Sequence, residues 1–149
     1  MRVDAVTVGE GTLSALVRFD PGEPLRTDAA VASRALAALP GLARHRCDND
    51  AGNTFAAEIR DTEVAHLLEH VACELMALAG SPRTLPGETS WDFARDGRGV
   101  FRVTLAFDDD LVGLGALKSA AEIVSALAED REPPDAASVA GRLRELRER

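Results

Sequence analysis

The segment from Thr62 to Ala79 constrains this chain more than any other, because its helical periodicity divides it into two unlike faces. When the residues are placed at about 100° intervals around a helix axis, the apolar side chains collect on one side. They are Val64, Leu67, Leu68, Val71, Leu75 and Leu78. The opposite side carries His66, Glu69, His70, Cys73 and Ala77. We therefore predict a helix over residues 62–79, with Thr62 as N-cap, Gly80 as its end, and its apolar face toward the core.

The remaining chain divides into shorter strands and helices. Strands are predicted over residues 2–8 and 12–19, joined as a hairpin, and over 55–59, 90–93 and 100–107. Helices are predicted over residues 29–39, capped by Thr27 and Asp28, and over 111–129 and 135–147. Residues 42–54 are predicted as a loop that can hold a short strand near His45. This order predicts one α+β domain over residues 1–149, with two layers in which helices pack on a largely antiparallel sheet.

The net negative charge of the chain limits the kinds of molecule that it is expected to bind. The formal net charge is −8, whereas a sequence-independent nucleic-acid binder needs a basic face. We expect no nucleic-acid partner, while a cationic substrate or partner is compatible with the charge. We find no signal peptide and no uncharged apolar stretch of roughly 18 residues, so we expect no membrane segment and a cytoplasmic location. The two cysteines, Cys47 and Cys73, are then expected to be reduced thiols.

The polar face of the predicted helix carries a metal-binding pattern. His66, Glu69 and His70 form H-x-x-E-H, the inverted form of the H-E-x-x-H zinc motif, and two of the chain's three histidines lie in it. One helical turn separates the two histidines, so both imidazoles can reach one ion. Zinc with an open coordination position activates water, and Glu69 is placed to act as the general base. The alternative interpretation is a helix with solvated polar residues on its outer face.

The residues around this helix resemble the N-terminal domain of cyanophycin synthetase. The resemblance covers roughly residues 36–149 and is specific over 39–80. It includes a Pro-Gly-Leu at 40–42, a His-x-Cys at 45–47, Gly52 and Phe55, the run H-x-x-E-H-V-A-x-E-L at 66–75, and Ala-Gly at 79–80. The later segments 99–103 and 143–147 resemble the family's G-x-Y-x-V strand and the end of its domain.

The chain also departs from that family. Asn53-Thr54 replaces a glycine pair, Phe101 replaces Tyr, and Cys73 stands where a small apolar residue is usual. The ATP-grasp and Mur-ligase-like domains of the synthetase are not in this sequence, nor is a Gly-rich phosphate loop. We therefore do not expect this chain to synthesise the polymer.

The same helix resembles that of pitrilysin-type metallopeptidases and S-ribosylhomocysteine lyase, which share a two-layer α+β fold. The peptidase resemblance implies a third zinc ligand from a glutamate on a later helix, and Glu145 lies 75 residues after His70. Glu122, Glu148 and Cys73 are alternatives, and a solvated role for Glu145 stays equally open. The lyase uses a Cys as its third ligand, but neither Cys47 nor Cys73 falls at the matching position, which disfavours lyase chemistry.

Several other residues have two interpretations each. Glu74 can support a ligand histidine by a hydrogen bond or be a surface charge. His45 and Cys47 form a separate H-x-C pair, with metal binding as the less favoured option. The Asp108-Asp109-Asp110 run is expected to cap the next helix rather than to bind a cation. Trp91, Arg95 and Arg98 flank a turn and could touch a substrate.

Two functional hypotheses follow from different classes. The first is a zinc-dependent amide or peptide hydrolase with His66, His70 and Glu145 as metal ligands and Glu69 as the catalytic base. The resemblance implies a cyanophycin-like or arginine-rich peptide substrate, with an aspartate backbone carrying arginine. The second is a non-catalytic binding or assembly module that keeps the synthetase N-domain fold. A homodimer is compatible with either.

Overall fold

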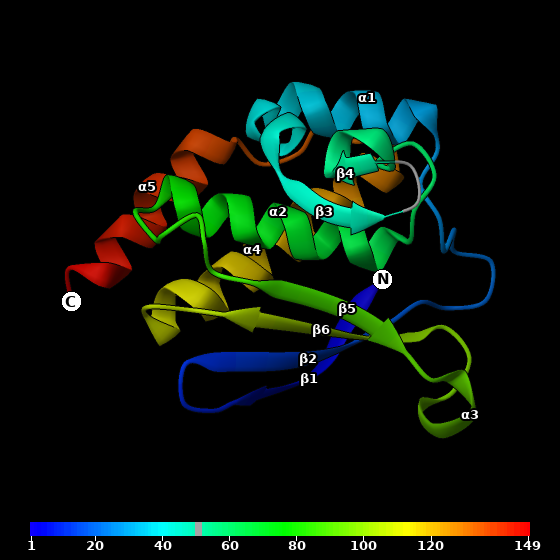
Figure 1. The fold of residues 1–149 in the computed structure, drawn as a ribbon, viewed down its shortest axis with the longest axis horizontal. Coiled ribbons are helices and arrows are strands. Elements are labelled where there is room, and N and C mark those ends of the chain that lie inside the picture. Colours follow the sequence, from blue (N-terminus) through cyan, green and yellow to red (C-terminus); the bar gives the residue numbers. More distant parts are fainter. Residues whose placement is uncertain (50–51) are drawn as a thin grey trace.

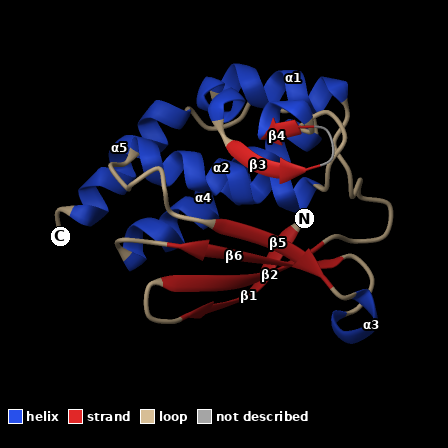
Figure 2. Ribbon diagram, viewed as in Figure 1, coloured by secondary structure: helices blue, strands red, loops and turns tan. Residues whose placement is uncertain are grey.

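The molecule is built on a four-stranded antiparallel sheet. The computed structural model describes residues 1–49 and 52–149, so Asp50, within the predicted loop, lies outside the described residues. The strands run in the order β1 (Arg2–Val8), β2 (Thr12–Arg18), β6 (Val100–Ala106) and β5 (Gly87–Trp91). Figures 1 and 2 show the sheet at the bottom of the molecule with the helices above it. The predicted α+β class and antiparallel sheet are confirmed.

The inner face of the sheet is set by the alternation along its two central strands. Leu13 and Val17 of β2 pair in register with Leu105 and Phe101 of β6. All four side chains are buried, because alternate residues of a strand point to the same face. That face is covered by α2 (Val64–Leu78) and α4 (Asp110–Ala128).

Helix α2 lies between two layers. The sheet is on one side, and the other side is covered by α1 (Ala29–Ala38), the 3-10 helix η1 (Pro40–Arg44) and the small hairpin of β3 (Arg46–Asn49) and β4 (Gly52–Thr54) (Figure 1). The short η2 (Phe55–Ala57) follows the hairpin, α3 (Phe93–Asp96) follows β5, and α5 (Ala136–Arg147) packs on α4 and α2. Both faces of α2 are consequently enclosed, including Glu69 and His70 of the polar face.

Two local predictions are wrong for identifiable reasons. Residues 55–59 begin as the 3-10 helix η2 rather than a strand, and Phe55 and Ile59 are both buried. Ala57 between them is exposed, which fits one helical turn, whereas in a strand residues 55, 57 and 59 would share one face. Thr62 does not cap α2: the helix has no side-chain N-cap, and the Thr62 hydroxyl instead contacts Glu58 and His66.

Helix α4 has a composition that a membrane span would also have. Its 19 residues have a mean hydropathy of 1.5, and within the described chain it meets the length and composition required to cross a membrane. Half of that stretch is buried inside the fold, and its neighbours are α2, α5 and α1. The core helix of a globular domain has these same properties, and α4 packs as such a helix in this fold.

Candidate metal centre

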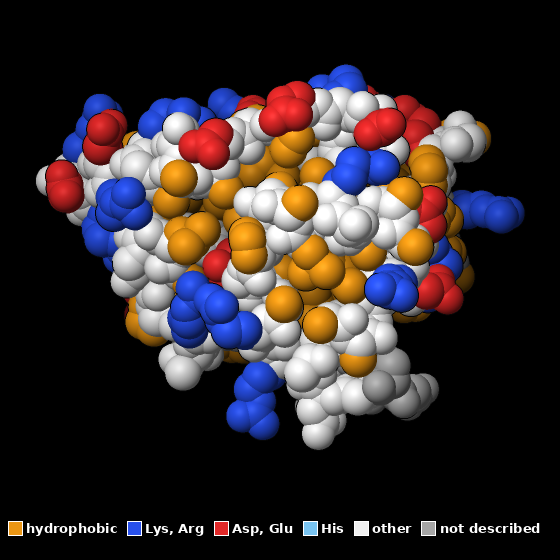
Figure 3. Space-filling model, turned by 90° about the horizontal axis from the view of Figure 1, so that it is seen from above, with side chains coloured by type: hydrophobic (Ala, Val, Ile, Leu, Met, Phe, Trp, Pro, Cys, Tyr) orange, Lys and Arg blue, Asp and Glu red, His pale blue; other side chains and the backbone are white. Residues whose placement is uncertain are grey.

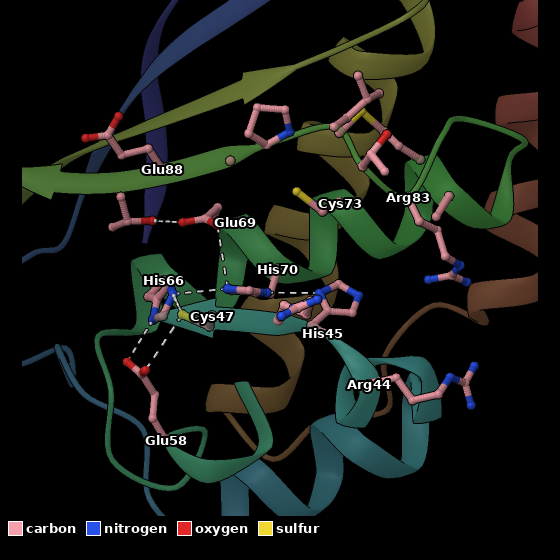
Figure 4. A pocket seen from close by; sticks show the side chains of 18 of the residues that line it. Arg44, His45, Cys47, Glu58, His66, Glu69, His70, Cys73, Arg83 and Glu88 are labelled. Carbon is pink, nitrogen blue, oxygen red and sulfur yellow. Dashed lines mark hydrogen bonds and ion pairs between the residues drawn. The ribbon is translucent and has the colours of Figure 1, made fainter. Parts of the chain in front are cut away.

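Two histidines of α2 and a cysteine of β3 converge on one point. The Nε2 atoms of His66 and His70 lie 3.1 Å apart, and Cys47 Sγ lies 3.4 Å from His66 Nε2. One potential ligand atom from each of the three residues falls within 4.8 Å of the others. Figure 4 shows Cys47 reaching the two imidazoles from the hairpin that covers α2. The fold thus joins the H-x-x-E-H motif to the separate H-x-C pair.

Phe55 fixes the ring planes at this point. It is completely buried, and its ring stacks on that of His70 with centroids 3.9 Å apart and an interplanar angle of 9°. It meets His66 edge-on, at 5.1 Å and 79°. The backbone N–H of Phe55 donates to the carbonyl of His45, which attaches the start of η2 to the approach to β3. One aromatic side chain therefore orients both imidazoles and ties them to the hairpin.

The outward nitrogens of the two histidines have acceptors. His66 Nδ1 lies 3.3 Å from Glu58 Oε1 and 2.9 Å from Thr62 Oγ1, and His70 Nδ1 lies 2.9 Å from His45 Nδ1. If each Nδ1 carries the proton, both Nε2 lone pairs point at the convergence point. A cation there satisfies them together. Two imidazole nitrogens and a thiol sulfur form a donor set that suits Zn²⁺, so these residues fit a zinc ion.

Burial keeps the ligand histidine neutral. Removal from water, together with the nearby His66 and His45, lowers the pKa of His70 to about 2. A neutral imidazole is the form that binds a metal. Burial likewise raises the pKa of the Cys73 thiol to about 12, with Glu69 and Glu74 adding to the effect. Cys73 lines the same pocket but stays protonated, so it is a poor ligand compared with Cys47.

Glu69 lies beside the convergence point and is held from β5. Its Oε2 is 3.6 Å from His70 Nε2, and Thr89 donates a hydrogen bond of 2.8 Å to its Oε1. Burial raises the pKa of Glu69, although the Thr89 hydrogen bond opposes that rise. A carboxylate in this position, with a raised pKa, is suited to exchanging a proton with a water at the centre.

Glu74 supports the site from one turn further along α2. It accepts from His45 Nε2 at 2.9 Å and from Arg83 Nη1 at 2.7 Å. Burial raises the pKa of Glu74, but hydrogen bonds from His45 and Arg83 outweigh it and lower the pKa to about 2. Glu74 is therefore ionised and buried, and it interacts with His70 through His45. The outer supporting role considered for Glu74 matches this geometry.

The centre opens into a cavity of about 860 Å³. Its walls come from η1, β3, α2, the loop before β5 and β5 itself. Figure 4 shows Glu58 and Glu88 at one end and Arg44 and Arg83 at the other, with the histidines, Cys47 and Glu69 between them. Trp91 of β5, 48% exposed, also lines this cavity, whereas Arg95 pairs with Asp96 outside it.

The structure does not bring Glu145 to the histidines. Glu145 is exposed on α5, and its neighbours Arg144 and Arg147 bind the carbonyls of Leu78 and Ala79 at the far end of α2. That end lies roughly 12 Å along the helix axis from His70. The alternatives Glu122 and Glu148 are also exposed and outside the cavity.

In the structure Cys47, and not Glu145, lies beside the two histidines of α2. The H-x-C spacing of His45 and Cys47 was the sequence feature that could have indicated Cys47. No pattern in the sequence, however, predicts that the hairpin carrying Cys47 folds over α2. The aspartate run behaves as expected of a cap: Asp109 accepts from the backbone N–H of Val112 at the start of α4. Asp108 instead pairs with Arg147.

Residues 26–129, about seven tenths of the chain, match the model of the cyanophycin synthase-like N-terminal domain. That span includes Cys47, His66 and His70, so the family match covers the candidate metal centre as well as most of the fold. The chain is therefore a member of the cyanophycin synthase-like N-terminal domain family. The match begins before the segment that carries the sequence resemblance and stops short of α5. No individual curated protein matches the chain.

Proposed function

We propose that this protein is a zinc-dependent hydrolase of amide or peptide bonds, with His66, His70 and Cys47 as metal ligands. The observation that carries the proposal is the convergence of two Nε2 atoms and one Sγ atom, with a buried carboxylate 3.6 Å from His70 Nε2. The cluster offers three protein ligands, and the adjoining cavity leaves room for a fourth position to be taken by water, as in catalytic zinc sites.

The chemistry divides between the ion and the chain. Cys47, His66 and His70 would hold the zinc ion, which would supply a water of lowered pKa. Glu69 accepts the water's proton as the water attacks the amide carbon, and it later delivers that proton to the leaving nitrogen. The Thr89 hydrogen bond occupies Oε1, which leaves Oε2 for the proton transfer. Enclosure of α2 between two layers limits competing water at Glu69.

For the substrate we propose a cyanophycin-like polymer or another arginine-rich peptide. Family membership supports this choice by analogy. The charges of the cavity support it independently, because carboxylates (Glu58, Glu88) and guanidinium groups (Arg44, Arg83) stand at opposite ends (Figure 4). A substrate that carries both carboxylates and guanidinium groups can complement both charged ends of the cavity, and its scissile bond would then lie between those ends.

Three further proposals accompany this function. A helix with H-x-x-E-H packed on an antiparallel sheet supports a relationship to the pitrilysin-type fold. A thiol ligand requires a reducing compartment, which supports a cytoplasmic location. A homodimer stays a prediction, and β1 is a sheet edge at which a second copy could pair.

The Glu69→Gln variant tests the function. It should bind about one zinc per chain, as the unaltered protein does, because Glu69 is outside the ligand set. Hydrolysis of a cyanophycin-like polymer should fall by about 10²–10⁴-fold, because the proton acceptor is lost. Metal content is measured by elemental analysis and hydrolysis by release of new amino groups.

Two results would contradict the proposal. A purified protein that holds no zinc, and whose stability ignores added zinc, has no metal centre. A zinc-loaded protein that is inert on amide bonds but retains the polymer belongs to the second class, a binding or assembly module. Thr104→Ser on β6 is a matched control, because Thr104 lies on the opposite face of the sheet from the centre, where its hydroxyl is 3.4 Å from that of Ser14.

A further inference from the structure

We propose that His45 and Glu74 are positioning residues that determine which nitrogen of His70 faces the metal. They form a hydrogen-bonded series that runs from Arg83 to Glu74, then to His45, then to His70. The inference rests on the proposed metal centre, but it does not depend on hydrolase activity. Neither His45 nor Glu74 belongs to the ligand group itself.

The direction of the hydrogen bonds follows from the charged end of the series. Arg83 carries donors alone, so Glu74 is the acceptor, as its ionised state requires. The same carboxylate accepts from His45 Nε2, which places a proton on that nitrogen. In the neutral imidazole His45 Nδ1 is then an acceptor. It faces His70 Nδ1 at 2.9 Å, so His70 carries its proton on Nδ1 and its lone pair on Nε2.

The series is held rigidly at each member. Glu74 is 2% exposed, and its carboxylate lies against Gly41, where a side chain would collide with it. His45 is fixed through its backbone, which donates to the carbonyl of Leu42 and accepts from the N–H of Phe55. His70 is clamped by the stacked ring of Phe55. The side chain of His45 is therefore held in a fixed position against His70.

His66 has a different arrangement, which isolates the role of His45. Its Nδ1 faces the carboxylate of Glu58 directly, a pairing common to zinc ligands. Among the described residues no carboxylate contacts His70 Nδ1; His45 contacts it instead and links it to the carboxylate of Glu74. Loss of His45 should therefore disturb His70 while leaving the support of His66 intact.

Substitutions at position 45 test the inference through zinc affinity. His45→Leu removes the acceptor and should weaken zinc binding by about 10–100-fold, the usual effect of losing an outer partner. His45→Asn places an amide oxygen near the position of Nδ1 and should retain more affinity than His45→Leu. Arg44→Met is the matched control, because Arg44 is exposed, precedes His45 and lines the same cavity. The zinc affinity of this variant should equal that of the native protein. Affinity is measured by competition with a chelating indicator.

A second measurement needs no variant. Long-range proton–nitrogen NMR spectra of the zinc-loaded native protein report which imidazole nitrogen carries each proton. We expect the proton of His70 on Nδ1 and that of His45 on Nε2. Equal zinc affinity in His45→Leu and the native protein overturns the inference while the metal centre stands. A His70 proton on Nε2 overturns the inference and also removes His70 Nε2 from the proposed ligands. A protein that binds zinc as expected but hydrolyses nothing contradicts the proposed function alone.

Discussion

At the scale of single residues, the two carboxylates beside the metal centre depend on glycines. A side-chain carbon at position 87 would lie 2.9 Å from Glu69 Cγ and 3.0 Å from its Oε2, which is closer than real side chains approach. A side chain at Gly41 would collide in the same way with Glu74. Neither glycine has a positive φ, so the missing side chain, and not backbone freedom, is what the site uses. The absence of a side chain at these two glycines leaves the space that the side chains of Glu69 and Glu74 occupy.

Gly87→Ala should therefore impair Glu69 without removing it. The added carbon pushes the carboxylate from its place beside His70, and misplacement of a general base by about 1 Å can cost roughly 100-fold in rate. Zinc affinity should be retained, because no ligand moves. Polymer hydrolysis and zinc titration on the same preparation measure the two effects. Gly9→Ala is the control, since a carbon there meets nothing closer than 3.7 Å, and activity unchanged in Gly87→Ala would show that Glu69 is not so constrained.

At the scale of elements, regular patterns made most of the fold predictable. Helix α2, the strands β1, β2 and β6, and the helices α1, α4 and α5 all follow predictions within one or two residues. Except in the largely exposed β1, each element buries one face and its apolar residues recur with the matching period. For the hairpin of β3 and β4 the sequence predicts only a loop with a short strand, because its residues are polar and do not alternate between apolar and polar. It carries Cys47, so the third donor depends on tertiary packing that no local pattern contains.

A contact between α5 and the turn that joins β6 to α4 makes stability depend on pH. Arg147 donates to Asp108, and both contact Ser81. The Arg147 hydrogen bond lowers the pKa of Asp108, against a smaller opposing effect of burial. A lowered folded-state pKa means that this stabilisation is complete above the ordinary carboxyl pKa of about 3.9 and is lost as the pH falls through the folded value.

Asp108→Asn should thus lower the free energy of unfolding by about 1 kcal/mol at pH 7, because the pair is partly exposed. The difference from the native protein should shrink steadily below pH 4. Urea unfolding at pH 7, 4 and 3 measures it. Glu122→Gln, an exposed substitution on α4, should show no such trend, and a difference that stays constant with pH would rule out the ionic contribution of Asp108.

At the scale of the whole molecule, the candidate metal centre lies where the outer layer meets α2, next to the hydrogen bonds that join His45 to His70 and Glu74. His66 and His70 belong to α2, which lies on the sheet, while Cys47 belongs to the outer hairpin on the α1 side. Seen from that side, charged side chains of both signs lie mainly toward the upper, left and right edges, and apolar side chains lie across the middle (Figure 3). A metal ion bound at the centre therefore links the outer layer to the core.

Zinc should stabilise the native fold as a whole for this reason. An ion that binds the native state alone, at about 100 times its Kd, adds about 2.7 kcal/mol, which for a chain of this size raises Tm by about 5–10 °C. Calorimetry with added zinc and with chelator measures the shift. Cys47→Ser should lose most of it, because a hydroxyl is a weak zinc ligand.

Two variants separate Cys47 from its rivals for the third ligand. Cys73→Ser should keep the full zinc-dependent shift in Tm, since the Cys73 thiol stays protonated and lies outside the ligand group. Glu145→Gln should keep it as well, because Glu145 is exposed on α5. If Glu145→Gln abolished the shift and Cys47→Ser preserved it, the ligand would be the glutamate expected from the sequence, and α5 would have to swing toward the middle of α2 to supply it. The arginines of α5 that bind the carbonyls at the end of α2 oppose such a movement.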